Sequence, residues 1–314
     1  MPLDAVLLVG VACLFAIVSG MNDGGALLAT GLKLPTVRPA TGIATMVVFV
    51  ALVPLATHQV ALTFVTRLAT FDGDGGRSAT TIAVICSLVV VLVLSAKGRP
   101  TSLTLAIVGG LTGAGLGWGL PVSGSSVALV LSFGVAAPVV GALLAWVVSG
   151  LLIKFTTTRG LWHWHWAGFL LQTLAYAAND GQKMLAVFMI ALGFSGAPLA
   201  YTSLVAALFG VGALYGLPKA GRTLSREIIA FRPLHGVSAE LSAGTAVLGC
   251  SALGMPVSMT QAIAGGLIGS GVNLGGGRVR WYAAVKIVTA WLLTLPASLL
   301  LAAVAAFLVK GAGA

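Results

Sequence analysis

Long, predominantly apolar stretches recur along the whole chain, and this feature limits the possible folds more than any other. Most are as long as the ~18 residues by which a membrane-spanning helix is recognised. Only 8% of the residues are charged, whereas soluble domains carry roughly 25%. The sequence therefore predicts an all-α polytopic membrane protein and excludes a water-soluble domain.

About ten membrane segments can be marked on this pattern. They cover residues 3–32, 40–65, 79–96, 100–117, 121–152, 166–195, 198–217, 236–254, 256–272 and 281–309. If all ten cross, an outside N-terminus leaves twelve Lys and Arg residues on the cytoplasmic side, Lys97 and Arg99 among them, and three outside. Because cytoplasmic loops carry an excess of Lys and Arg, we predict a multi-pass protein of the plasma (inner) membrane with both termini outside. The net charge of +10 then reflects topology, and no nucleic-acid partner is expected.

Two segments depart from a simple span. Residues 3–32 are too long for one untilted crossing and are interrupted by Asn22 and Asp23, which favours a broken helix. Residues 100–115 would form a helix of only about 24 Å, short of a ~30 Å hydrocarbon core. We therefore expect this piece to be re-entrant.

The chain contains an internal repeat. The sixteen residues from Pro100 to Gly115 share ten identities with those from Pro256 to Gly271. Asn22-Asp23-Gly24 likewise recurs as Asn179-Asp180-Gly181, at almost the same offset. Two short blocks at one spacing, carrying the two Asn-Asp pairs, indicate a duplication.

This duplication divides the chain into two membrane-embedded repeats. The first covers residues 1–157 and the second 158–314, with a basic cytoplasmic connector at 218–235. Five segments per half is an odd number, so the second repeat is expected to enter the membrane from the opposite face. The predicted architecture is therefore a pair of inverted-topology repeats with broken or re-entrant helices.

Asp23 and Asp180 are acidic residues deep inside apolar segments, at equivalent positions of the two repeats. A carboxylate at bilayer depth costs at least ~2.5 kcal/mol, so it needs a cation, a proton or water beside it. With Asn22 and Asn179 as neutral ligands, the two acids are predicted to form one central cation site. The alternative is that the Asn-Asp pairs only cap the second halves of broken helices.

The two Pro-x-Ser-x-Thr blocks have the features of an anion site. Proline suits the first helical turn, so each block marks a helix start whose free N–H groups face an anion. Hydroxyl donors are added by Ser102, Thr104, Ser258 and Thr260. Common capping chemistry explains one such block, but its duplication in register with the acids favours a substrate site.

Gln182 and Lys183 follow Asp180 and are assigned to the substrate site as well. Lys183 lies three residues after Asp180, on the same helical face. It either neutralises Asp180 as a structural ion pair or attracts an anionic substrate, and the sequence leaves both open.

Other motifs have simpler explanations. Gly109 and Gly113, like Gly265 and Gly269, have the spacing of close helix packing. The tryptophans of 162–166 are typical of headgroup anchors, with a metal site at His163 and His165 as the weaker alternative. No phosphate-binding loop, zinc-protease motif or nucleophile elbow occurs, so neither an enzyme nor ATP-driven transport is indicated. No cofactor beyond a coupling Na⁺ or H⁺ is expected.

The paired Asn-Asp blocks, above all 179–183, and the paired Pro-x-Ser-x-Thr blocks resemble the inorganic phosphate transporter (PiT) family. The stretch from Gly216 to Pro296 looks like the C-terminal half of that family. The chain departs from the family's Pro-Val-Ser-Thr-Thr-His block, since Leu103 and Leu105 replace its first Thr and its His in one half, and Met259 and Gln261 replace them in the other.

This resemblance implies a secondary active transporter, a symporter that imports inorganic phosphate with a sodium or proton gradient. It also implies that the Asn-Asp pairs bind the coupling cation and that the hydroxyl-rich helix starts hold the anion. The expected partners are phosphate, the cation and membrane lipids, with a homodimer left open. A permease for another oxyanion such as sulfate, or a passive anion channel, is the alternative.

Overall fold

The computed structural model describes residues 3–30, 36–68, 71, 75–97, 101–229 and 232–312. Within these ranges the chain is almost entirely helical, apart from one isolated bridge between Ile229 and Val279. The helices are α1 (Leu3–Ser19), α2 (Gly25–Ala29), α3 (Pro39–Ala56), α4 (Gln59–Leu62), α5 (Gly76–Ala96), α6 (Leu103–Trp118), α7 (Gly124–Phe155), α8 (Gly160–Tyr176), α9 (Gln182–Leu192), α10 (Leu199–Glu227), α11 (Pro233–Ala252), α12 (Met259–Asn273) and α13 (Trp281–Gly311). Shorter helical turns are η1 (Gly20–Gly24), η2 (Thr63–Leu68), η3 (Ala177–Gly181) and η4 (Gly276–Arg278).

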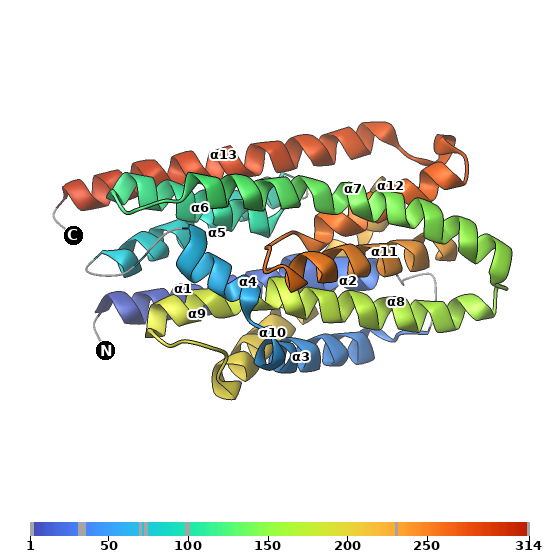
Figure 1. Cartoon of the computed structure of the whole chain (residues 1–314), viewed down its shortest axis with the longest axis horizontal. Coiled ribbons are helices and arrows are strands. Elements are labelled where there is room, and N and C mark those ends of the chain that lie inside the picture. The colour runs from blue at the N-terminus through green and yellow to red at the C-terminus, as the bar shows by residue number, and fades with distance from the viewer. Residues whose placement is uncertain are drawn as a thin grey trace.

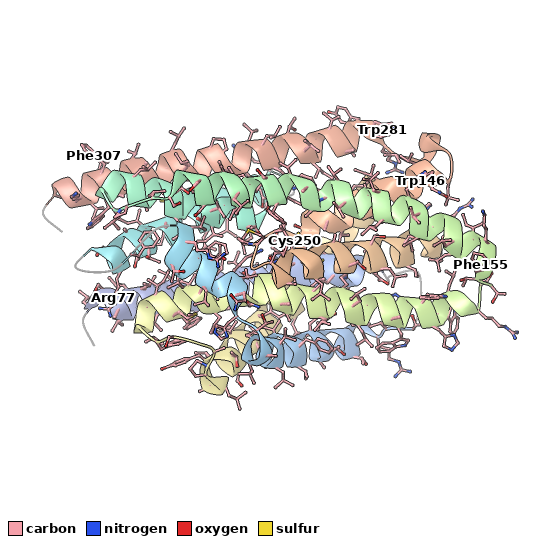
Figure 2. All side chains as sticks on the ribbon, viewed as in Figure 1. Arg77, Trp146, Phe155, Cys250, Trp281 and Phe307 are labelled. Atoms are coloured by element: carbon pink, nitrogen blue, oxygen red, sulfur yellow. The ribbon has the colours of Figure 1, made fainter. Side chains whose placement is uncertain are left out.

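The long helices run along the long axis of the molecule, and both termini lie at the same end (Figure 1). Six helices of the described part are long and apolar enough to cross a membrane. The two longest, α7 and α13, are the least buried of these and expose large apolar side chains such as Trp146 and Phe307 (Figure 2). Apolar surface on this scale is stable against lipid but not against water. The predicted all-α, multi-pass membrane class is confirmed.

Four of the predicted segments form two hairpins instead of four crossings. The start of α5 and the end of α6 lie together, because a Cβ on Gly75 would be 2.2 Å from the indole nitrogen of Trp118. The start of α11 and the end of α12 lie together at the opposite end. There the segment that precedes α11 pairs with the segment that follows α12, and the Arg280 N–H donates to the Ile228 carbonyl at 2.9 Å. The tips of the two hairpins meet near the middle of the molecule (Figure 1).

This arrangement supports the prediction of a re-entrant piece at 100–115 and corrects the assumption that all ten segments cross. The orientation expected for the remaining helices is unchanged, because each hairpin returns to the end from which it entered. Lys97, however, follows α5 at a hairpin tip and not at the end of the molecule. Arg99, assigned with it to the cytoplasmic side, lies outside the described residues.

The two Asn-Asp pairs lie in π-helical turns, η1 and η3, that join α1 to α2 and α8 to α9. The backbone stays helical through both turns, so the predicted break at Asn22 and Asp23 is a π-bulge and not an unwound segment. π-bulges are frequent at functional sites. A real interruption occurs instead at Thr57 and His58, which separate α3 from α4 inside the predicted segment 40–65.

The predicted connector at 218–235 is partly helical, because α10 continues to Glu227. The side chains of 217–227 lie outside the described part of the structure.

The paired glycines pack the hairpins against the two long outer helices. A Cβ on Gly113 of α6 would lie 2.0 Å from the Leu299 carbonyl oxygen of α13, and one on Gly269 of α12 would lie 1.9 Å from the Ala142 carbonyl oxygen of α7. Real Cβ atoms do not approach backbone this closely, so only glycine allows these contacts. The packing interpretation of the glycines is confirmed.

Replacing Gly113 or Gly269 by alanine is expected to lower the stability of the protein by about 1–3 kcal/mol, because the backbones must move apart. The measurement is the midpoint of thermal unfolding of the detergent-purified variants. Gly134→Ala in α7 is the matched control, since a Cβ there meets no atom within 4 Å. A Gly113→Ala variant as stable as Gly134→Ala would contradict this account of the helix packing.

Candidate functional site

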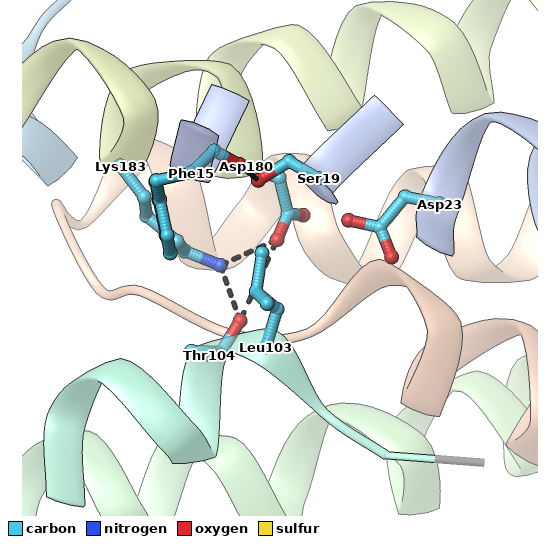
Figure 3. A pocket seen from close by; sticks show the side chains of 7 residues that line it. All are labelled: Phe15, Ser19, Asp23, Leu103, Thr104, Asp180 and Lys183. Atoms are coloured by element: carbon cyan, nitrogen blue, oxygen red, sulfur yellow. Dashed lines mark hydrogen bonds and ion pairs between the residues drawn. The ribbon is translucent and has the colours of Figure 1, made fainter. Parts of the chain in front are cut away.

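A narrow pocket lies beside the tip of the first hairpin, in the middle of the helical bundle. It is lined by Phe15, Ser19, Asp23, Leu103, Thr104, Asp180 and Lys183. Figure 3 shows the two carboxylates facing one another, with Lys183 and Thr104 on the side of Asp180 away from Asp23. The pocket thus brings together both acids and one predicted hydroxyl, from both halves of the chain.

Asp23 is buried, and its hydrogen-bond partners are neutral. Oδ1 accepts from the Asn22 amide at 2.8 Å, and Oδ2 accepts from the Tyr176 hydroxyl at 3.3 Å. Among the described residues no salt bridge to a basic side chain is formed by Asp23. A buried carboxylate without a direct counter-charge attracts a cation or a proton strongly.

Asp180 has a different environment, because it is paired with Lys183. The Lys183 Nζ donates to Asp180 Oδ1 at 2.7 Å, to Thr104 Oγ1 at 2.7 Å, and to the Val257 carbonyl oxygen. The three N–H donors of the ammonium group are therefore matched by three acceptors. Of the two interpretations of Lys183, the structure favours a buried ion pair with Asp180.

The Lys183 ammonium also connects the two hairpins. Thr104 lies in the first turn of α6, and Val257 lies two residues before α12. The Thr104 hydroxyl itself donates to the Val257 carbonyl oxygen at 3.1 Å. The ammonium group bonds to both residues (Figure 3 shows the bond to Thr104). In this structure the two hairpin tips are therefore bonded to one another beside the pocket.

Asn179 holds the tip of the second hairpin. Its amide donates to Ser251 Oγ at 2.9 Å and to the Met255 carbonyl oxygen at 3.0 Å, and its Oδ1 accepts from the Val257 N–H at 3.0 Å. Neither α2 nor α9 receives a side-chain cap. The alternative that the Asn-Asp pairs only cap these helices is therefore wrong.

The predicted hydroxyls are distributed unevenly around the pocket. Ser102 caps α6, accepting from the Leu105 N–H at 3.2 Å, while Ser258 and Thr260 bond to one another at 2.9 Å. All four predicted hydroxyl side chains are buried, but only Thr104 lines the pocket. The remaining three lie at the helix starts beside it.

Gln182 does not line the pocket. Its Oε1 accepts from the backbone N–H groups of Val60 and Ala61 at 2.8 and 3.2 Å, at the start of α4. This bonding restarts the helix after the interruption at Thr57 and His58. The geometry thus gives Gln182 a structural role in place of the predicted substrate contact.

Three contributors to the site were not predicted from the sequence: Tyr176, Ser19 and the Val257 carbonyl. Tyr176 lies one turn before Asp180 in the sequence, and this spacing was an available signal. Ser19 lies four residues before Asp23 and donates to the Phe15 carbonyl at 2.8 Å. A backbone carbonyl such as that of Val257 leaves no trace in the sequence.

His163 and His165 do not form a metal site together. His163 is exposed, whereas His165 is buried and bonds to Glu240. No cluster of three or more His, Cys, Asp or Glu side chains suited to a metal occurs in the described ranges.

Comparisons with known proteins agree on one family. A family model described as the phosphate transporter family matches residues 164–302. A probable low-affinity inorganic phosphate transporter of Rhizobium meliloti is 29% identical, over 96% of this chain and 95% of that protein. One of Mycobacterium bovis is also 29% identical, over 91% of this chain and 72% of that protein.

A solved structure titled the sodium-dependent phosphate transporter superimposes with a TM-score of 0.85, covering 98% of this chain and 99% of that one. Because its sequence identity is 17%, this match is evidence for the fold alone. The relatives are named as transporters, in agreement with the prediction that the chain is not an enzyme.

Proposed function

We propose that this chain, which is similar to proteins of the phosphate transporter family, imports inorganic phosphate by secondary active transport, coupled to a cation gradient. The observation that carries this proposal is the central pocket in which Asp23, Asp180, Lys183 and Thr104 converge from both halves of the chain. A central site beside two hairpin tips suits a carrier that exposes it to each side in turn.

Asp23 is the proposed ligand of the coupling cation. Its carboxylate has only neutral hydrogen-bond partners, and Asn22 Oδ1 supplies a further neutral oxygen beside it. Asp180 and Asn179 were predicted to share this role. Since Lys183 already neutralises Asp180, the second acid contributes to the field of the pocket while Asp23 takes the cation or proton itself.

Phosphate is proposed to bind where the hairpin tips part. Opening of the first hairpin breaks the bond from Lys183 to Thr104, and opening of the second breaks the bond to Val257. The freed ammonium donor then faces an anion. Thr104, together with Ser102, Ser258 and Thr260 at the two helix starts, supplies hydroxyl and N–H donors. Lys183 thus links the two hairpin tips in this structure and binds phosphate when the tips separate.

The deciding experiment is uptake of labelled phosphate into proteoliposomes under separately imposed sodium and proton gradients. We expect accumulation above the external concentration with one of the two gradients, and its collapse when an ionophore dissipates that gradient. Uptake that only equilibrates phosphate would identify a passive anion channel. Stronger competition by unlabelled sulfate than by unlabelled phosphate would identify a permease for another oxyanion.

Further features of the proposal concern topology and location. We propose the plasma (inner) membrane, with both termini outside and the end that carries Arg38 and Lys154 in the cytoplasm. The division into inverted repeats at residues 157 and 158 is supported by the exchanged packing, in which α6 contacts α13 and α12 contacts α7. The homodimer stays a prediction.

A further inference from the structure

A second cluster of buried polar groups lies outside the pocket, between α2, α8 and α11. Glu240 of α11 is fully buried, and its Oε2 lies 2.8 Å from Nδ1 of His165 in α8. Its other oxygen, Oε1, accepts from the hydroxyl of Thr30, directly after α2, at 2.8 Å. Both carboxylate oxygens are thus held by groups from two other helices.

The fold makes room for this acid. A Cβ on Gly168, one turn after His165, would lie 2.9 Å from the Glu240 Cβ and 3.0 Å from its Oε2. A glycine at this position therefore allows α8 and α11 to approach closely around a carboxyl group. The packing of α8 against α11 thus accommodates the Glu240 side chain specifically at Gly168.

The electrostatics of the pair require a proton. An imidazolium with a carboxylate is neutral overall, and so is an imidazole with a carboxylic acid, and each state holds one proton. Removal of that proton leaves one uncompensated negative charge buried in the bundle, which is costly. The pair is therefore a one-proton site.

Among the described residues, no other charged side chain forms a salt bridge with His165 or Glu240; Asp180 lies in η3, which packs on α8 and α11, and Arg159 and Arg232 lie at the starts of these two helices. α2 and α12 contain no titratable side chain, and that of α7 is Lys154, exposed in its last turn. On α8 the remaining titratable groups are His163, which is exposed, and Tyr176, which belongs to the pocket. On α11, His235 lies five residues before Glu240 and is itself buried with a partner, and Cys250 lies ten residues beyond it. Lys33, shortly after Thr30, lies outside the described residues.

The cluster is connected to the pocket along α8. Thr30 lies seven residues after Asp23 on the same helical run, which is about 10 Å along the axis. Between them, Gln172 Nε2 donates to the Leu27 carbonyl at 3.0 Å. Buried polar atoms without a partner in the described structure follow this path, namely His165 Nε2, Gln172 Oε1 and Thr173 Oγ1. Such atoms are typical positions for ordered water.

We propose that His165 and Glu240 form an internal proton-binding site that locks α2, α8 and α11 together at the end of the molecule that carries Arg38 and Lys154. Loss of the proton leaves a buried charge that is relieved when water enters, so deprotonation favours opening of this end. The consequence for phosphate flux rests on the proposed transport function, whereas proton binding does not.

The first test is ¹⁵N NMR of the full chain in nanodiscs with labelled histidine. The chain has four histidines, so single His→Gln variants assign the signals. We expect the His165 signals to change when the pair loses its proton as the pH is raised, and this change to be altered in Glu240→Gln. His163→Gln is the matched control and should leave it unaltered. His165 signals that show no response to pH, or that ignore Glu240→Gln, would overturn the proposal.

The second test is the pH profile of phosphate uptake, with size-exclusion chromatography to verify that each variant is folded. Wild-type uptake is expected to change with pH as the pair loses its proton. In His165→Gln, which keeps a donor for Glu240 but carries no proton, the profile should differ from that of the wild type, whereas His163→Gln should keep the wild-type profile. Wild-type vesicles without any uptake would refute the transport function, while a transporting His165→Gln variant with an unchanged profile would refute the proton site.

Discussion

Asp23→Asn is expected to abolish gradient-driven phosphate uptake while leaving the protein folded. Asparagine has nearly the same shape and keeps an oxygen for the Asn22 and Tyr176 donors, but it carries no charge. At a separation of about 4 Å and an effective dielectric constant of about 20, the lost attraction for a monovalent cation is about 4 kcal/mol. This corresponds to about a thousandfold lower cation affinity. The measurement is labelled phosphate uptake into proteoliposomes with the coupling gradient imposed.

Asp4→Asn is the matched control for this variant. Asp4 lies near the start of the same helix but is partly exposed, 3.8 Å from Arg77. Exposed ion pairs contribute little, so uptake by this variant should equal that of the wild type. Wild-type accumulation in Asp23→Asn vesicles would remove Asp23 from the cation site. Asp180→Asn is also expected to lose uptake, because Lys183 is left without its counter-charge.

Lys183→Met is expected to have the largest effect on stability. Methionine fills similar space but leaves Asp180 as a buried, uncompensated carboxylate and breaks the link between Thr104 and Val257. Removal of one partner of a buried ion pair costs about 3–5 kcal/mol. We expect a clear loss of folded protein after heating, measured by size-exclusion chromatography in detergent.

The double variant Asp180→Asn with Lys183→Met separates the charge effect from the packing effect. It removes both charges, so most of the lost stability should return, because well-packed neutral side chains replace a buried ion pair at little cost. Lys286→Met, at an exposed position on α13, is the control and should be close to wild type. If Lys183→Met were as stable as Lys286→Met, the bonds of Lys183 to Asp180, Thr104 and Val257 would not stabilise the fold.

The repeat and the buried acids could be recognised from the sequence because they are local signals. A charged residue in an apolar segment is visible at once, and the 157-residue offset relates Asp23 to Asp180 without any structure. The same offset also suggested that the two acids behave alike. They do not, because Lys183 follows only the second acid and the first repeat has Ala26 at the corresponding position.

The hairpins illustrate what hydropathy leaves undecided. A segment of sixteen to twenty apolar residues can cross the bilayer or turn back within it, and its composition is the same in both cases. The decision is made by packing: Gly113 of α6 lies directly against the backbone of α13, and Gly269 of α12 lies directly against that of α7. Similarly, Gln182 had the composition of a ligand, but the free N–H groups of α4 occupy its oxygen.

The sequence alone therefore determined the class of the protein, its repeated halves, the buried acids and the hydroxyl-rich helix starts. Each of these follows from hydrophobicity or from similarity between short stretches, which depend on neighbouring residues. Tertiary structure alone decided that Lys183 bonds to the Val257 carbonyl and that His165 meets Glu240, 75 residues away. The physical reason is that such contacts depend on how distant helices pack, and a backbone carbonyl or a partner far along the chain has no signature in the residues beside it.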